Sequence, residues 1–138
     1  MIVNALSLTG YQVEITTGTH RLIADESVGS GDDAGPDPYG LLLAALGACK
    51  VMTVQMYARR KNWPLEGAEV SLTTHKIHAR DCEDCESDPN ARVDIIEAEL
   101  TFDGDLMPEQ VKRLAVIADR CPVHRTLTSE TKIRSRVV

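Results

Sequence analysis

The sequence contains few aromatic residues and no long uninterrupted run of apolar residues. Phe, Trp and Tyr together make up 4 % of the 138 residues. The longest uncharged apolar stretch, residues 41–49, is about half of a membrane span. The first residues lack the basic start and continuous apolar segment of a secretory signal. We therefore expect a cytoplasmic protein without a membrane partner.

Positive charge is also scarce. The chain has 15 Lys and Arg against 21 Asp and Glu, which gives a net charge of -6. No basic cluster offers the positive surface that nucleic acids require, so no nucleic-acid partner is expected. In a reducing compartment, the four cysteines favour a reactive or metal-binding role over structural bridges. The length suits one hydrophobic core, and we expect a single domain over residues 1–138.

Turn residues and apolar periodicity predict the order of the elements. Residues 2–26 alternate as short strands, and a Gly- and Pro-rich loop follows. Asp37 and Pro38 are typical of a helix start, and the helix is expected to run to about Asn62. Strands are expected over 67–80 and 91–104, a second helix from Pro108, and a final strand over 131–138.

This order predicts an α+β fold with a mostly antiparallel sheet and a long buried central helix. The central helix is apolar on nearly every side through Tyr57. Such a helix must pack against other segments on every side. A chain with only two substantial helices has few segments to do so. We therefore expect a homodimer.

Two cysteines distant in sequence are candidates for chemistry. Cys49 lies within the apolar helix, where a cysteine either packs as a small apolar side chain or reacts. Cys121 follows one helix and directly precedes Pro122, so it lies near the N-cap of a new turn, where free N–H groups favour a thiolate. A helix break with an incidental cysteine is the alternative.

The segments "GPDPYGLLLAALGAC" and "CPVHRTL", with "RLIADE" before them, resemble the OsmC/Ohr family of peroxide-handling proteins. The resemblance covers essentially the whole chain. It implies an intertwined homodimer in which Cys49 attacks an organic hydroperoxide and Cys121 resolves the sulfenic acid into a disulfide. It also implies a dithiol reductant of the lipoyl type, no cofactor, and a substrate pocket to which Tyr39 and Met52 contribute.

One position departs from the family pattern. Dedicated peroxidases of this kind use an arginine, held by a glutamate ten residues before the first cysteine, to keep that cysteine ionised. The matching position here is Tyr39, whose phenol is neutral near pH 7. Arg21 is the first candidate for the arginine and Arg125 the second. The chain therefore resembles the less characterised OsmC-related branch, and a non-catalytic relative that binds a small molecule or metal is the alternative.

An acidic loop supplies the candidate metal ligands. His75, His78, Cys82 and Cys85 fall within eleven residues in "THKIHARDCEDCE", and a C-x-x-C turn is a common half-site for zinc. The carboxylates beside the thiols oppose thiolate formation but attract a cation. His75 and His78 are three apart in an expected strand and point to opposite faces, so His78, Cys82 and Cys85 form the smaller candidate set. A solvated acidic loop and a Cys82–Cys85 disulfide are the alternatives.

Overall fold

A computed structural model describes all 138 residues, and their contacts divide the chain into two compact units. The first unit is Met1–Ala45 and the second is Leu46–Val138. The single domain over 1–138 therefore stays a prediction. The α+β class is confirmed, because antiparallel sheets and a long central helix are both present.

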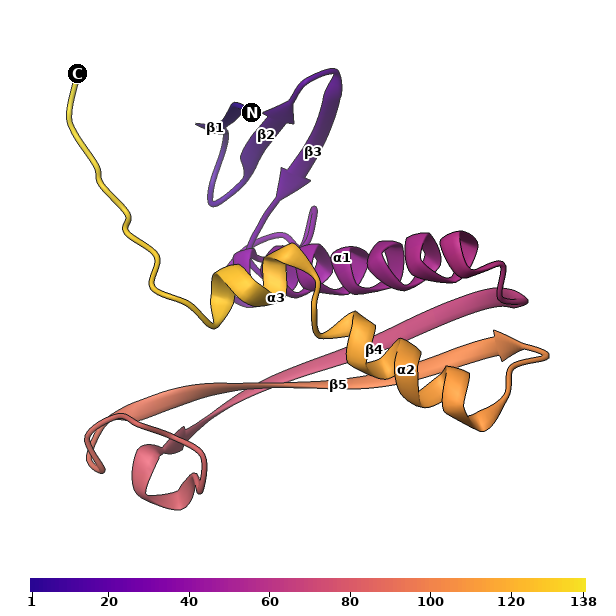
Figure 1. Cartoon of the computed structure of the whole chain (residues 1–138). Coiled ribbons are helices and arrows are strands. Elements are labelled where there is room, and N and C mark those ends of the chain that lie inside the picture. Colours follow the sequence, from indigo (N-terminus) through magenta and orange to yellow (C-terminus); the bar gives the residue numbers. More distant parts are fainter. The chain divides into compact units, whose positions relative to one another are not determined.

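The first unit contains a three-stranded antiparallel sheet (Figure 1). Its strands are β1 (Val3–Ser7), β2 (Val13–Thr17) and β3 (His20–Ala24), in the order β1-β2-β3. Gly18 has a φ of 56°, which lets the chain reverse within two residues between β2 and β3. The alternation predicted over residues 2–26 is thus confirmed.

The loop after β3 is organised around Asp25, a residue that is only 3 % exposed. The Asp25 carboxylate accepts hydrogen bonds from the backbone N–H groups of Glu26, Asp32 and Ala34 at 2.8, 3.2 and 3.1 Å. Gly35 passes so close to β3 that a Cβ there would lie 2.0 Å from the Ile23 carbonyl oxygen. A loop that reads as irregular from composition is therefore held by one buried carboxylate.

Helix α1 (Pro38–Lys61) begins and ends close to the predicted residues. The Asp37 carboxylate accepts the Gly40 N–H at 2.6 Å, which satisfies one of the free donors of the first turn. Asn62, with a φ of 55°, follows the last helical residue. Arg59, Arg60 and Lys61 occupy the last turn, where cations suit the helix dipole.

Burial of α1 is confined to one stripe. Leu46, Lys50, Val54 and Ala58 are buried at four-residue spacing, whereas Met52 and Met56 are exposed. Within one chain the outer face of Leu46–Lys61 is thus only partly covered, and the homodimer that is expected to complete its cover stays a prediction. By length and composition α1 could span a membrane, but its buried stripe is that of a core helix.

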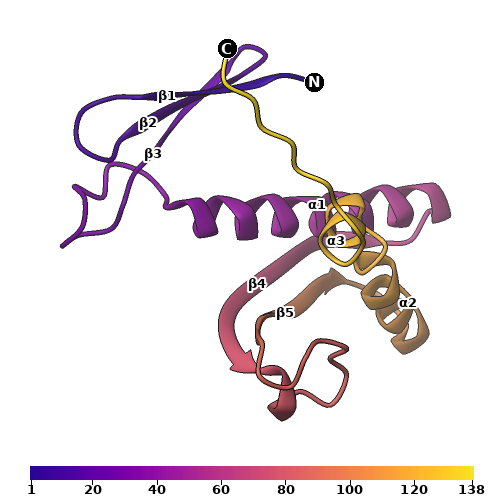
Figure 2. The ribbon, with the colours of Figure 1, turned by 90° about the vertical axis from the view of Figure 1, so that its left-hand side faces the viewer.

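A long antiparallel hairpin forms the sheet of the second unit (Figures 1 and 2). Strands β4 (Leu65–His78) and β5 (Arg92–Gly104) pair along their length, and the short helix η1 (Ala79–Asp81) begins the loop between them. Helix α2 (Pro108–Ala118) lies beside the hairpin in both views. These elements confirm the strands and helix predicted between residues 67 and 118.

The core of the second unit lies where α1, α2 and the hairpin meet. Val54 and Ala58 of α1 pack with Leu114 and Ala118 of α2, and all four are at most 1 % exposed. Partly buried side chains of the hairpin complete the cluster, namely Leu65, Ala68, Leu100 and Phe102. This core fixes the C-terminal end of α2 against the middle of α1, which is where both candidate cysteines lie.

The last residues differ from the prediction. Helix α3 (Pro122–Leu127) is followed by residues 129–138, which are all exposed and form no strand. The apolar side chains of Ile133, Val137 and Val138 favour a strand by composition. A strand also needs a neighbour that accepts and donates its backbone hydrogen bonds, and no segment of this chain pairs with residues 131–138.

Candidate functional site

The two distant cysteines meet in the second unit. Cys49 lies on α1 and is half-buried, and Cys121 follows α2 and is 0 % exposed. Both thiols are free, and the Cys49 side chain lies close enough to Cys121 to raise the pKa of the Cys121 thiol. The pair is therefore placed for chemistry in which one sulfur reacts and the other captures the product.

Cys121 is the N-cap of α3, as its position before Pro122 predicts. Its backbone is extended, with φ -62° and ψ 143°, and Pro122 opens the helix. The Cys121 Sγ accepts the backbone N–H of His124 at 3.2 Å. The cap fixes the side chain of Cys121, since its sulfur is held by the helix that it begins.

Opposing influences act on the ionisation of Cys121. Burial raises the pKa of its thiol above the ordinary value, because a thiolate is poorly solvated there. The His124 N–H lowers that pKa, the neighbouring Cys49 thiol raises it, and the positive charge of Lys50 lowers it. The net result is a raised pKa. Cys121 therefore holds its proton more firmly than an ordinary cysteine does.

Lys50 is the one charged residue of the buried α1 stripe. Its side chain is 3 % exposed, and its Nζ donates to Asp119 Oδ1 at 2.7 Å and to the Ala118 carbonyl at 3.4 Å. His124 Nδ1 lies 3.2 Å from the same Nζ. An ammonium can only donate, so His124 Nδ1 serves as the acceptor in the tautomer that leaves this nitrogen without a proton. All three N–H groups of Lys50 thus have an acceptor.

A cavity of about 450 Å³ opens beside this cluster. Its polar lining residues are Lys50, Asp94, Asp119, His124 and Thr128. The remaining wall is mainly apolar and comes from α1, the hairpin and α3, through Leu46, Leu72, Ile96, Ala98 and Leu127. A cavity of this size, with polar and apolar residues in equal number, suits a small molecule that carries both polar and apolar groups.

The other residues predicted for the site lie as follows. Arg21 is on β3 and forms an ion pair with Glu14 of β2. Tyr39, in the first turn of α1, and Met52 are both exposed. Arg125 is exposed on α3 and has no carboxylate partner. Their roles stay predictions.

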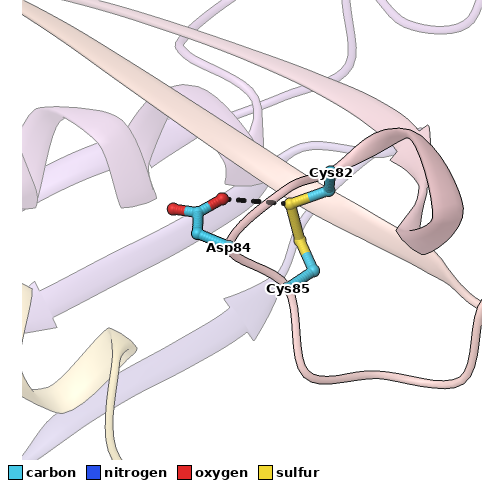
Figure 3. The surroundings of a disulfide bond; sticks show 3 residues. All are labelled: Cys82, Asp84 and Cys85. Carbon is cyan, nitrogen blue, oxygen red and sulfur yellow. Dashed lines mark hydrogen bonds between the residues drawn. A yellow bond between two sulfur atoms is a disulfide. The ribbon is translucent and has the colours of Figure 1, made fainter.

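The acidic loop contains a disulfide between Cys82 and Cys85, whose Cα atoms are 5.4 Å apart (Figure 3). Asp84 Oδ1 lies 3.2 Å from Cys82 Sγ. The ligand atoms of these three residues lie within 4.8 Å of one another, and neither His75 nor His78 belongs to the group. His78 Nδ1 is buried without a hydrogen-bond partner. Because a disulfide sulfur is a poor ligand, a metal here requires the reduced loop.

Sequence reasoning missed Lys50 and Asp119. The signal for Lys50 was present, because a lysine at position 50 shares a helical face with Leu46, Val54 and Ala58. A lysine on a core-facing stripe indicates a partner that pairs with its charge. Nothing in the sequence identifies that partner as Asp119, which comes 69 residues later.

Comparison with known proteins gives a family and a fold. Residues 30–136 match the family model described as OsmC-like protein. An OsmC-like protein from Mycoplasma pneumoniae has a TM-score of 0.72 and 16 % identity, covering 92 % of this chain and 86 % of that chain. The organic hydroperoxide resistance protein OhrB of Bacillus subtilis has a TM-score of 0.61 and 17 % identity, covering 91 % and 89 %.

A third solved structure, an organic hydroperoxide resistance protein OsmC from Legionella pneumophila, has a TM-score of 0.64 and 18 % identity, covering 91 % and 87 %. At such identities these three structures establish the fold alone. No curated protein sequence matches the chain. The family match spans most of the sequence and agrees with the two-cysteine motifs, so this chain belongs to the OsmC-like protein family.

Proposed function

We propose that this protein is a thiol-dependent peroxidase that reduces organic hydroperoxides in defence against oxidative stress. The observation that carries the proposal is the proximity of two free thiols, those of Cys49 and Cys121, which come from distant segments. Membership of the OsmC-like family supports it, as do fold neighbours named for organic hydroperoxide resistance.

Cys49 is the peroxide-reacting thiol in this proposal, because it is half-buried whereas Cys121 is fully enclosed. The Cys49 thiolate attacks the peroxide O–O bond, the bond breaks, and the alkoxide leaves and takes a proton as an alcohol. Cys49 becomes a sulfenic acid. The Cys121 thiolate then attacks the Cys49 sulfur, an S–S bond forms, and the hydroxide leaves with a proton as water.

A dithiol reductant of the lipoyl type closes the cycle. One of its thiolates attacks the Cys49–Cys121 disulfide, its second thiol displaces the enzyme sulfur, and both cysteines return to thiols while the reductant becomes a disulfide. The half-buried position of Cys49 makes its sulfur the point of attack.

Arg21 is proposed to assist Cys49 as the activating cation. Tyr39 stands at the position where a carboxylate would hold such an arginine, but Glu14 already pairs with Arg21 across β2 and β3. A chain with Tyr39 can therefore keep an arginine–glutamate pair. Tyr39 and Met52, both exposed, are proposed to contribute to the wall that receives the hydroperoxide.

The proposed working form is a cytoplasmic homodimer. Met52 and Met56 are 59 % and 63 % exposed on α1, and burying apolar side chains of this size is favourable. Because α1 is apolar on nearly every side, we propose that a second copy of the chain buries the surface that the first copy leaves exposed. The active sites would lie at the interface of the two copies.

The test is a single turnover with cumene hydroperoxide. One equivalent added to the reduced protein should remove two thiols and produce a Cys49–Cys121 disulfide, located by peptide mapping. Cys49→Ser should abolish peroxide consumption, whereas Cys121→Ser should accumulate the sulfenic acid. The double variant Cys82→Ser/Cys85→Ser is the matched control and should retain activity. Undiminished consumption by Cys49→Ser would overturn the proposal.

A further inference from the structure

Lys50 connects the two segments that carry the cysteines. We propose that Lys50 is a positioning residue of the dithiol site, which holds the α2–α3 connection against α1 and places a positive charge beside the Cys121 sulfur. This inference deepens the proposed function and rests on it, because the charge has a chemical use only if Cys121 reacts.

The geometry supports the holding role. Lys50 directly follows Cys49, and its three hydrogen-bond partners surround Cys121 in the sequence. The Ala118 carbonyl and Asp119 precede Cys121, at 3.4 and 2.7 Å from Nζ, and His124 follows it at 3.2 Å. One ammonium therefore ties the helix of the first cysteine to both flanks of the second.

The burial of Lys50 is the reason to expect a role beyond packing. The stripe that Lys50 shares with Leu46, Val54 and Ala58 packs into the core, and an apolar side chain at position 50 would continue it. A buried charge is unfavourable unless it is paired and fully hydrogen-bonded, and even a paired charge rarely stabilises more than an apolar residue would. The position thus holds a lysine at the expense of stability, which indicates a use for its charge.

That use follows from the groups that face Cys121. From α1 these are the Cys49 thiol and the Lys50 ammonium, and from α3 the His124 N–H. Asp119, at the end of α2, contacts Lys50 and lies two residues before Cys121. Lys50 is the cation of this set, and it lowers the pKa of Cys121 against the effect of burial.

The charge acts in the step that forms the disulfide. The Cys121 sulfur must be anionic to attack the Cys49 sulfenic acid, with the S–O bond breaking and the hydroxide leaving as water after it takes a proton. The hydroperoxide is the oxidant of the overall reaction. A nearby ammonium raises the fraction of Cys121 that is anionic before the attack.

The test titrates Cys121 alone, by the ¹³Cβ chemical shift of labelled cysteine, in protein with Cys49, Cys82 and Cys85 replaced by Ser. Lys50→Met should move the titration of Cys121 to higher pH, and Lys50→Arg should restore it. Asp119→Asn should move it to lower pH, because a negative charge is lost while the ammonium stays. Lys112→Met, an exposed lysine on α2, is the matched control and should leave it unchanged.

Lys50→Met and Asp119→Asn should shift the titration of Cys121 in opposite directions. Loss of structure alone would not produce opposite shifts, so this result identifies an effect of charge. In protein that retains all cysteines, Lys50→Met should also slow disulfide closure near pH 7, because a smaller fraction of Cys121 is then anionic. Coincident titration curves for all variants would overturn the inference. If Lys50→Met does not fold, Lys50→Arg and Asp119→Asn still decide it. The titration contains no peroxide, so a protein without peroxidase activity gives the same answer.

Discussion

The Lys50 ammonium and the Asp119 carboxylate form an ion pair of unequal burial, 2.7 Å apart, in which the lysine side chain is 3 % exposed and the aspartate 64 %. Removing the aspartate leaves a charge in the core, whereas removing the lysine leaves a carboxylate that water can solvate. We predict that Asp119→Ala lowers the free energy of unfolding by about 1–3 kcal/mol.

Lys50→Met should leave the free energy of unfolding nearly unchanged or raise it, because an apolar side chain continues the buried stripe of α1. Urea denaturation of both variants with the wild-type protein measures the difference. If Lys50→Met lowers the free energy of unfolding more than Asp119→Ala does, the unequal burial of the two side chains does not determine their contributions to stability.

The core between α1, α2 and the hairpin can be tested by replacing Leu114. This residue is 0 % exposed, so Leu114→Ala should leave a cavity and lower the free energy of unfolding by about 2–5 kcal/mol. Val116→Ala, on the same helix at 48 % exposure, is the matched control and should cost less than about 1 kcal/mol. Equal losses in denaturant titrations would place the core elsewhere.

Cys121 makes stability depend on pH in alkaline solution. Because burial raises the pKa of its thiol above the ordinary value of 9.0, the folded state holds this proton more tightly than the unfolded state. The contribution is fully present below pH 9.0 and is lost as the pH rises through the folded-state pKa.

We therefore expect the free energy of unfolding to fall more steeply between about pH 8 and about pH 10 in the wild-type protein than in Cys121→Ser. Urea denaturation at the two pH values measures both slopes. A steeper fall in the variant would contradict a raised pKa.

The Cys82–Cys85 disulfide should matter little to the fold. It closes a loop with a sequence separation of only three residues, so it restricts the unfolded chain weakly. Cys82→Ser/Cys85→Ser should change the free energy of unfolding by less than about 2 kcal/mol.

Reduction of the same loop should create zinc affinity, since Cys82, Cys85 and Asp84 then offer two thiolates and a carboxylate. Equilibrium dialysis with zinc should detect binding to the reduced protein and lose it in Cys82→Ser/Cys85→Ser. Equal zinc binding by the oxidised protein would place the metal site outside this loop.

The exposed methionines of α1 test the proposed dimer. Replacing Met52 and Met56 by Glu puts two charges on the apolar surface that a second copy would cover, and burying unpaired charges is unfavourable. Light scattering after size exclusion should give a dimer for the wild-type protein and a monomer for the double variant. Glu substitutions at the exposed positions Arg59 and Lys61 control for charge alone.

Much of the fold could be predicted because its signals are local. Asp37 and Pro38 mark the start of α1, and the alternating residues of β2, β3, β4 and β5 need only their own neighbours to be recognised. Residues 131–138 show the limit of that reasoning. Their composition favours a strand, but strand formation depends on a pairing partner that composition does not reveal.

The candidate site was predictable to the same extent. Cys49 and Cys121 stand in recognisable motifs, and the N-cap position of Cys121 follows from Pro122. The ion pair of Lys50 with Asp119 was not predictable, because it depends on how the end of α2 packs against α1. The Asp25 carboxylate is a similar case, since its three backbone partners lie in a loop without periodicity.

The hairpin of β4 and β5 has only two strands, so each strand has one edge whose backbone groups meet no other strand. Along both strands, amides directed at the partner alternate with amides directed outward. In deuterated water the inward amides should exchange slowly and the outward ones fast. Slow exchange of the outward amides along one edge would locate where a further strand is added in the assembled protein.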